Sequence, residues 1–123
     1  MADLTITPAN TLRISGTKTT KVAGENMTVG MPVYAFNTTH MKMAITTNAT
    51  TAGAVGITLH NATTDQPITY LSDGTLALGA ILTAGETYCV SNTSGNICTT
   101  GDITTGKYLT YVGYASTTAN LTI

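Results

Sequence analysis

Charge is what this sequence has least of. Only 9% of its 123 residues are Asp, Glu, Lys or Arg, against roughly 25% in a typical soluble domain. The five Lys and Arg residues form no run, and the net charge is −1. Proteins that bind nucleic acids need clustered cations to displace counterions from phosphates. The composition therefore argues against a nucleic-acid partner.

Long apolar runs and an export signal are also missing. No stretch of the sequence approaches the ~20 apolar residues of a membrane-spanning helix, so we expect no membrane partner. The first five residues (MADLT) contain no positive region followed by an apolar block, and so no secretory signal peptide is recognised. We expect the chain to be made and folded in a cytoplasm.

The side chains that carry catalysis or hold metals are few. His40 and His60 are the two histidines, and neither lies in a metal-type doublet. The serines lack the G-x-S-x-G context of a nucleophile, and the acidic residues stand mostly at turns, where they bend the backbone. We therefore predict that the protein is not an enzyme and has no cofactor or metal site.

Threonine, in contrast, is abundant, with 29 residues in the chain. Thr is β-branched and favours strands over helices. Hydrophobic residues make up 42%, which is enough for one modest core in a chain of this length. A surface of Thr, Asn and Ser with few charges is typical of a protein that packs against copies of something else.

Apolar residues alternate with small or polar ones in several short windows. Residues 54–60 place Val55, Ile57 and Leu59 on one face, and residues 41–45 and 119–123 alternate in the same way. Period two predicts strands with one buried face. Turn clusters recur every 8–12 residues, and no window has a helical period longer than one turn. The sequence predicts an all-β fold, a small antiparallel sandwich, roll or barrel-like domain.

Residues 107–115 (KYLTYVGYA) are apolar on both faces of a strand, with Tyr108, Tyr111 and Tyr114 spread over them. Such a pattern indicates a central strand or a strand whose second face is covered by a partner chain. We predict that these tyrosines lie at a subunit contact, and burial in the core is the alternative.

Cys89 and Cys98 are the two cysteines. If residues 87–91 and 96–100 form a hairpin, Val90 faces Ile97 and the cysteines lie directly opposite one another, within reach of a cross-strand disulfide. A reducing cytoplasm favours thiols at synthesis. Three states stay open: free thiols, a bond formed after release, and a metal site, for which no further ligand stands at short spacing.

Four segments carry a family resemblance. They are residues 22–34 (VAGENMTVGMPVY), 54–59 (AVGITL), 66–70 (QPITY) and 78–91 (LGAILTAGETYCVS). Together they resemble the small capsid decoration proteins of tailed bacteriophages, also called cement or head fibre proteins. The likeness runs from about residue 18 to the end, and its motifs are structural rather than catalytic.

The resemblance implies a virion protein on the outer surface of an icosahedral capsid, with the major capsid protein as partner and a homotrimer as its state. It would clamp adjacent capsid subunits. Residues 18–123 would form the single all-β decoration domain, and residues 1–17 an N-terminal arm or edge strand. Leu4 and Ile6 alternate with threonines in this arm, so we expect them to dock on a capsid sheet edge.

Other classes of protein share parts of this pattern. A viral fibre or host-recognition module has the same low charge and high Thr content, and its exposed tyrosines would line a glycan-binding face. A bacterial surface-layer or adhesin module would require an export signal. An enzyme would require a convergent set of ionisable groups. Location in the particle separates the first alternative from decoration.

Overall fold

The computed structural model describes residues 3–4, 6, 11–103 and 105–123. These residues include eleven strands and a short 3₁₀ helix, η2, and no α-helix occurs among them. The predicted all-β class is therefore confirmed. The elements are β1 (Leu12–Ser15), β2 (Lys18–Ala23), β3 (Pro32–Ala35), β4 (His40–Met43), β5 (Gly56–Thr58), β6 (Pro67–Leu71), β7 (Thr75–Ala77), β8 (Thr87–Val90), β9 (Ile97–Thr99), η2 (Thr100–Asp102), β10 (Tyr111–Ala115) and β11 (Asn120–Thr122).

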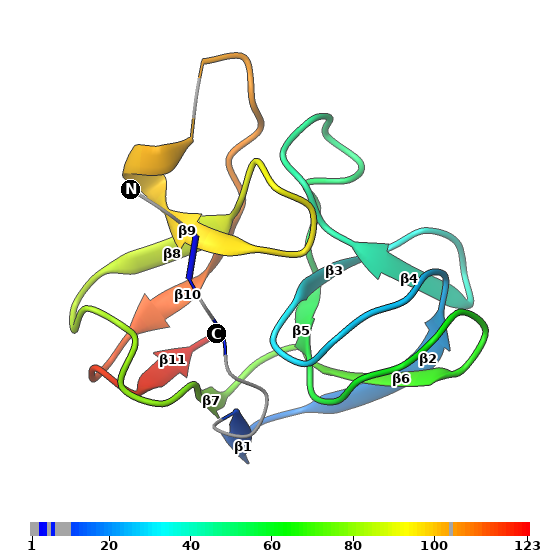
Figure 1. Cartoon of the computed structure of the whole chain (residues 1–123), viewed down its shortest axis with the longest axis horizontal. Coiled ribbons are helices and arrows are strands. Elements are labelled where there is room, and N and C mark those ends of the chain that lie inside the picture. The colour runs from blue at the N-terminus through cyan, green and yellow to red at the C-terminus, as the bar shows by residue number, and fades with distance from the viewer. Residues whose placement is uncertain (1–2, 5, 7–10, 104) are drawn as a thin grey trace.

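The strands form two sheets that lie side by side (Figure 1). Strands β2, β4, β3, β5 and β6 close into a barrel, and a six-stranded sheet has the order β1-β7-β11-β10-β8-β9. Strands β2 and β4 pair in parallel, whereas the strands of the six-stranded sheet pair antiparallel. Closure leaves the barrel without an edge strand, so the open edges belong to β1 and β9.

A hydrophobic core joins the two sheets. Ile57 and Leu71 of the barrel belong to the same buried cluster as Leu76 and Leu121 of the six-stranded sheet. A smaller cluster fills the barrel around Val33. Because apolar burial is the main favourable term in folding, the shared cluster makes the barrel and the sheet one packed unit.

Each alternating window buries one of its apolar residues fully. Ile57, Met41 and Leu121 are fully buried. Val55 is an exception, because it is exposed. Strand β5 begins only at Gly56, where a Cβ would lie 2.5 Å from the Leu71 carbonyl oxygen. The backbones of β5 and β6 therefore approach closely at the glycine, and the regular alternation does not extend back to Val55.

The predicted central position of the strand in residues 107–115 is confirmed. Strand β10 lies between β8 and β11 and is hydrogen-bonded to both. The strand is shorter than the window, because it begins only at Tyr111. Just before it, the Thr110 carbonyl oxygen accepts the Val90 N–H of β8 at 3.0 Å.

Tyr34 generates a prediction for alkaline pH. Burial raises the pKa of its phenol above the ordinary value of about 10, and the negative charge of Glu25 raises it further. The unfolded chain then loses this proton at lower pH than the folded chain. Stability that is present below pH ~10 should therefore be lost as pH rises above that value.

We expect the free energy of unfolding to fall as the pH rises above about 10, and to fall less steeply in Tyr34→Phe. Urea denaturation at a series of pH values measures the free energy of unfolding of the natural protein and of the variant. Equal slopes in the two proteins would contradict this assignment.

Candidate functional site

Two of the three predicted tyrosines lie on the same face of β10. Tyr111 lies opposite Cys89 and Tyr114 lies opposite Thr87, so three steps along β10 match two steps along β8. The extra residue is a β-bulge. In a regular strand, residues three apart point to opposite faces. Because directly opposed residues share a face, the bulge places both tyrosines on the side of Cys89 and Thr87.

At the two tyrosines this shared side faces solvent, whereas Cys89 on the same side is buried. Tyr111 is 62% exposed and Tyr114 is 51% exposed, whereas Val112 and Ala115 are buried in the core. The apolar residues on the second side of β10 are therefore not covered by this chain. This position fits the predicted subunit contact, which stays a prediction.

A row of hydroxyl side chains crosses the sheet at Tyr114. Ser15 pairs with Thr75, Thr75 with Thr122, Thr122 with Tyr114, and Tyr114 with Thr87. These residues come from β1, β7, β11, β10 and β8, so neighbouring members lie about 4.8 Å apart. We call Tyr111, Tyr114 and this row the tyrosine face. Its side chains are uncharged, and their hydroxyl groups can both donate and accept hydrogen bonds.

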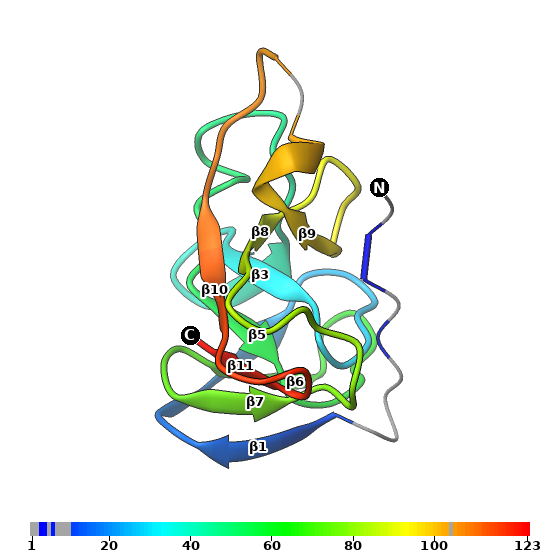
Figure 2. The same cartoon turned by 90° about the vertical axis from the view of Figure 1, so that its left-hand side faces the viewer.

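Tyr108 is placed differently. It lies in residues 107–110, which rise beyond the end of the sheet beside the loop of residues 45–55 (Figures 1 and 2). The Tyr108 N–H donates to the Thr46 carbonyl oxygen at 3.0 Å, and its side chain is 49% exposed. The structure thus brings Tyr111 and Tyr114 together and sets Tyr108 on a projecting segment.

The described residues of the predicted arm contact the chain's own domain. The Leu4 N–H donates to the Ile97 carbonyl oxygen of β9 at 2.9 Å, and Leu4 and Ile6 pack against the larger core. The Asp3 carboxylate accepts hydrogen bonds from Ser91 and Asn96. Docking of Leu4 and Ile6 on a capsid stays a prediction, and residues 1–2, 5 and 7–10 of the arm lie outside the described residues.

The cysteine hairpin has the predicted register. Val90 lies opposite Ile97, and Cys89 lies opposite Cys98. Both cysteine side chains are buried thiols, and their Sγ atoms are 3.9 Å apart. A disulfide requires about 2.05 Å, so a modest movement of the two side chains would bring the sulfurs into bonding distance.

The two histidines lie apart from the tyrosine face. His60 Nε2 accepts the Thr69 N–H at 3.0 Å, and His60 Nδ1 donates to the Asn61 carbonyl oxygen at 2.9 Å. His40 Nε2 lies 3.7 Å from the Asp65 carboxylate. No group of three or more His, Cys, Asp or Glu placed to hold a metal ion is found in the part of the chain that the structure describes. The described residues also contain no helix with the length and apolar character to cross a membrane.

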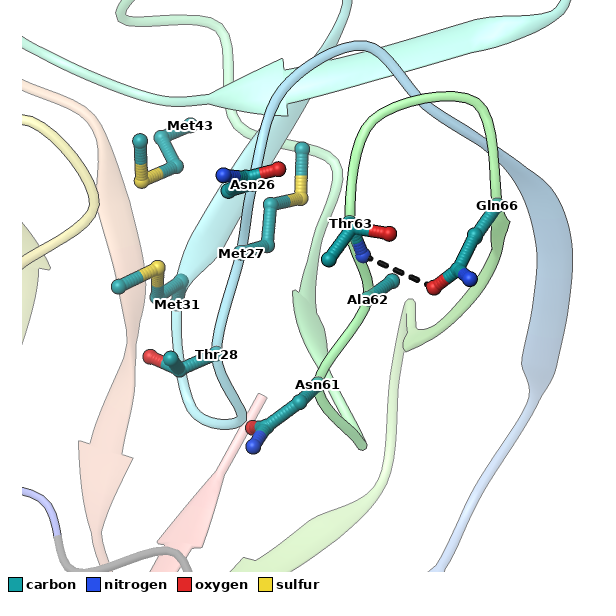
Figure 3. Close-up of a pocket in the computed structure, with 9 residues that line it drawn as sticks. All are labelled: Asn26, Met27, Thr28, Met31, Met43, Asn61, Ala62, Thr63 and Gln66. Atoms are coloured by element: carbon teal, nitrogen blue, oxygen red, sulfur yellow. Dashed lines mark hydrogen bonds between the residues drawn. The ribbon is translucent and has the colours of Figure 1, made fainter.

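A pocket in the barrel was not predicted from the sequence. It has a volume of about 370 Å³ and is lined by Asn26, Met27, Thr28, Met31, Met43, Asn61, Ala62, Thr63 and Gln66 (Figure 3). We call it the methionine pocket. Three of the five methionines of the chain line it, and this clustering in residues 27–43 is the signal that could have indicated it.

A comparison with protein-family models gives no match for this chain, and a comparison with curated proteins gives none either. The resemblance to decoration proteins therefore depends on the quoted sequence motifs alone. A functional assignment has to be argued from the tyrosine face and the methionine pocket.

The contacts of the N-terminal segment generate a stability prediction. Leu4→Ala and Ile6→Ala remove partly buried apolar groups, so each should lower the free energy of unfolding by about 1–2 kcal/mol. Ile14→Ala is the matched control, because Ile14 is 52% exposed, and its effect should stay within about 0.5 kcal/mol. Urea denaturation measures all three. Effects no larger than that of the control would show that the segment does not stabilise the fold.

The cysteine pair generates a second prediction. Diamide should remove the two thiol hydrogens and join Cys89 to Cys98, so that the chain loses the mass of two hydrogen atoms. Closing this short loop should raise the free energy of unfolding by up to about 3 kcal/mol. Mass spectrometry and urea denaturation measure the two effects, with Cys98→Ser as the control. An unchanged mass after refolding in the oxidant would refute the pairing.

Proposed function

We propose that this chain is a structural virion protein that binds the outer surface of an icosahedral capsid and stabilises contacts between major capsid subunits. The observation that carries the proposal is the tyrosine face. It combines two exposed aromatic rings with hydroxyl groups from five neighbouring strands.

The chemistry of this face suits a tight contact between proteins. Tyrosine is enriched at interface centres, because its ring covers a large apolar area with few torsions to fix. The hydroxyl groups of Thr75, Thr122 and Thr87 can hydrogen-bond a partner without desolvating ions. A low-charge protein gains in particular from such contacts, since it has few ion pairs to offer.

The proposed location follows from the partner. A protein made in the host cytoplasm would reach the assembled shell and attach to the major capsid protein from outside. A homotrimer would present three tyrosine faces at once. Multivalent attachment makes individually weak contacts collectively tight, so the clamp between capsid subunits would resist internal pressure.

Host recognition is a second candidate. The two threonines that lie beside Tyr114 favour it. Thr122 and Thr87 lie on either side of the Tyr114 ring. An aromatic ring with neighbouring hydroxyl groups could stack on the apolar face of a sugar and bind its hydroxyl groups. A fibre module would then use the tyrosine face for a glycan rather than for a capsid.

Sedimentation of the purified protein with expanded capsids of the encoding virus tests decoration. We expect saturable binding near one copy per major capsid subunit, or a simple fraction of it. The double variant Tyr111→Ser/Tyr114→Ser should weaken this binding by about 30-fold or more, the loss expected when hot-spot residues are removed. Ile14→Ser removes an equally exposed apolar side chain from β1 and should bind as the natural protein does.

Two outcomes would overturn decoration. The first is absence of binding to shells, with the protein found only in tail or fibre fractions. The second is full binding by the double variant. Glycan-array binding that is lost in the double variant, together with location at a vertex or tail, would support host recognition instead.

A further inference from the structure

The floor of the methionine pocket is apolar and adaptable. Met27, Met31 and Met43 line it. A Cβ at Gly95 would lie 2.7 Å from Met43 Sδ and 3.1 Å from Met31 Sδ, so these two thioethers also lie against the loop between β8 and β9. Figure 3 shows Met27, Met31 and Met43 around one space. Methionine is flexible and polarisable, and its sulfur makes favourable contacts with aromatic rings. The floor therefore suits an aromatic side chain.

The rim of the pocket offers hydrogen-bond donors. Each carboxamide oxygen accepts a backbone N–H of this chain, at 3.0 Å for Asn26, 2.9 Å for Asn61 and 3.1 Å for Gln66. These bonds fix which end of each carboxamide carries the oxygen. None of the three NH₂ groups has a protein acceptor among the described residues. A complementary ligand carries acceptors beside its aromatic ring.

An acidic side chain lies beside the pocket. Glu25 precedes Asn26 in the chain, and its carboxylate accepts the Met43 N–H at 2.9 Å. This carboxylate attracts a cationic group and repels an anionic ligand. The expected occupant is therefore aromatic, rich in acceptors, and accompanied by a positive charge.

The chain itself presents such an occupant outside the barrel, on the segment that precedes β10. Tyr108 stands on the projecting segment with its ring half exposed, and Lys107 precedes it with an exposed side chain. The phenolic oxygen can accept from a rim NH₂ group, and the backbone carbonyls beside it add further acceptors. Tyr111 and Tyr114 lie within β10, between β8 and β11, whereas Tyr108 stands on the projecting segment and can reach into a concave pocket.

We propose that the methionine pocket receives Tyr108 of a second copy of this chain. The Tyr108 ring lies on the thioethers, its hydroxyl group bonds the carboxamide rim, and Lys107 faces Glu25. Tyr108 and the pocket are different surfaces of the same chain, so the contact is heterologous, and we expect successive copies to close into a ring. The inference rests on the proposed function in expecting several copies, but it uses residues outside the tyrosine face.

Sedimentation velocity of the protein alone tests the contact. The natural chain should form a closed oligomer, and Tyr108→Ser should raise its dissociation constant by about 30-fold or more. Thr63→Trp, at an exposed position on the rim, should block the pocket with the same effect. Lys107→Glu should weaken assembly by up to about fivefold. Ile14→Ser is the control and should assemble normally.

A mixing experiment distinguishes this contact from a symmetric one. Tyr108→Ser keeps a working pocket and Thr63→Trp keeps a working Tyr108, so the two monomeric variants should combine as a heterodimer that cannot close. Methyl NMR of methionine-labelled protein gives an independent readout. The signals of Met27, Met31 and Met43 should differ between the natural oligomer and Tyr108→Ser, while that of the buried Met41 should not.

Three results would overturn the inference. They are a monomeric natural chain at its highest soluble concentration, unchanged assembly of both single variants, and a mixture of the two that stays monomeric. Failure here leaves capsid binding by Tyr111 and Tyr114 standing, and failure of capsid binding leaves self-assembly standing, because the two experiments use different variants and different measurements.

Discussion

The packing of the six-stranded sheet against the barrel is the contact on which the rest of the structure depends. Leu76 and Leu121 from the sheet and Ile57 and Leu71 from the barrel are fully buried in one cluster. A strand has two faces, so once one face is buried the residues of the other must meet solvent or a partner. In the six-stranded sheet this second face carries hydroxyl groups and the ring of Tyr114.

The bulge in β10 decides which side chains lie on the exposed face of the six-stranded sheet. Without the extra residue, burial of Val112 and Ala115 would be out of step with the pairing to β8, and Tyr111 and Tyr114 would point to opposite faces. Bulges are frequent where a strand must redirect a side chain. The cost of the irregular pairing at this point is offset by a surface with two exposed rings on one side.

Because the chain has few charged side chains, amide and hydroxyl groups make most of the hydrogen bonds between side chains and backbone in the described part of the chain. The carboxamide oxygens of Asn26, Asn61 and Gln66 hold backbone N–H groups, and the side-chain oxygens of Asn37 and Asn48 do the same in other turns. This is the ordinary way in which short polar side chains stabilise loops. At the methionine pocket it has a further consequence, because the three NH₂ groups point away from the backbone N–H groups that the oxygens bind.

Period-two alternation and turn residues are local properties, and the sequence by itself determined what depends on them: the all-β class, the burial of Met41, Ile57 and Leu121, and the register of the hairpin that pairs Cys89 with Cys98. Only the tertiary structure decided the bulge beside Tyr111, the packing of Leu4 on the chain's own core, and the methionine pocket. Each of these depends on strand pairing or packing between segments distant in the sequence, which no local window contains.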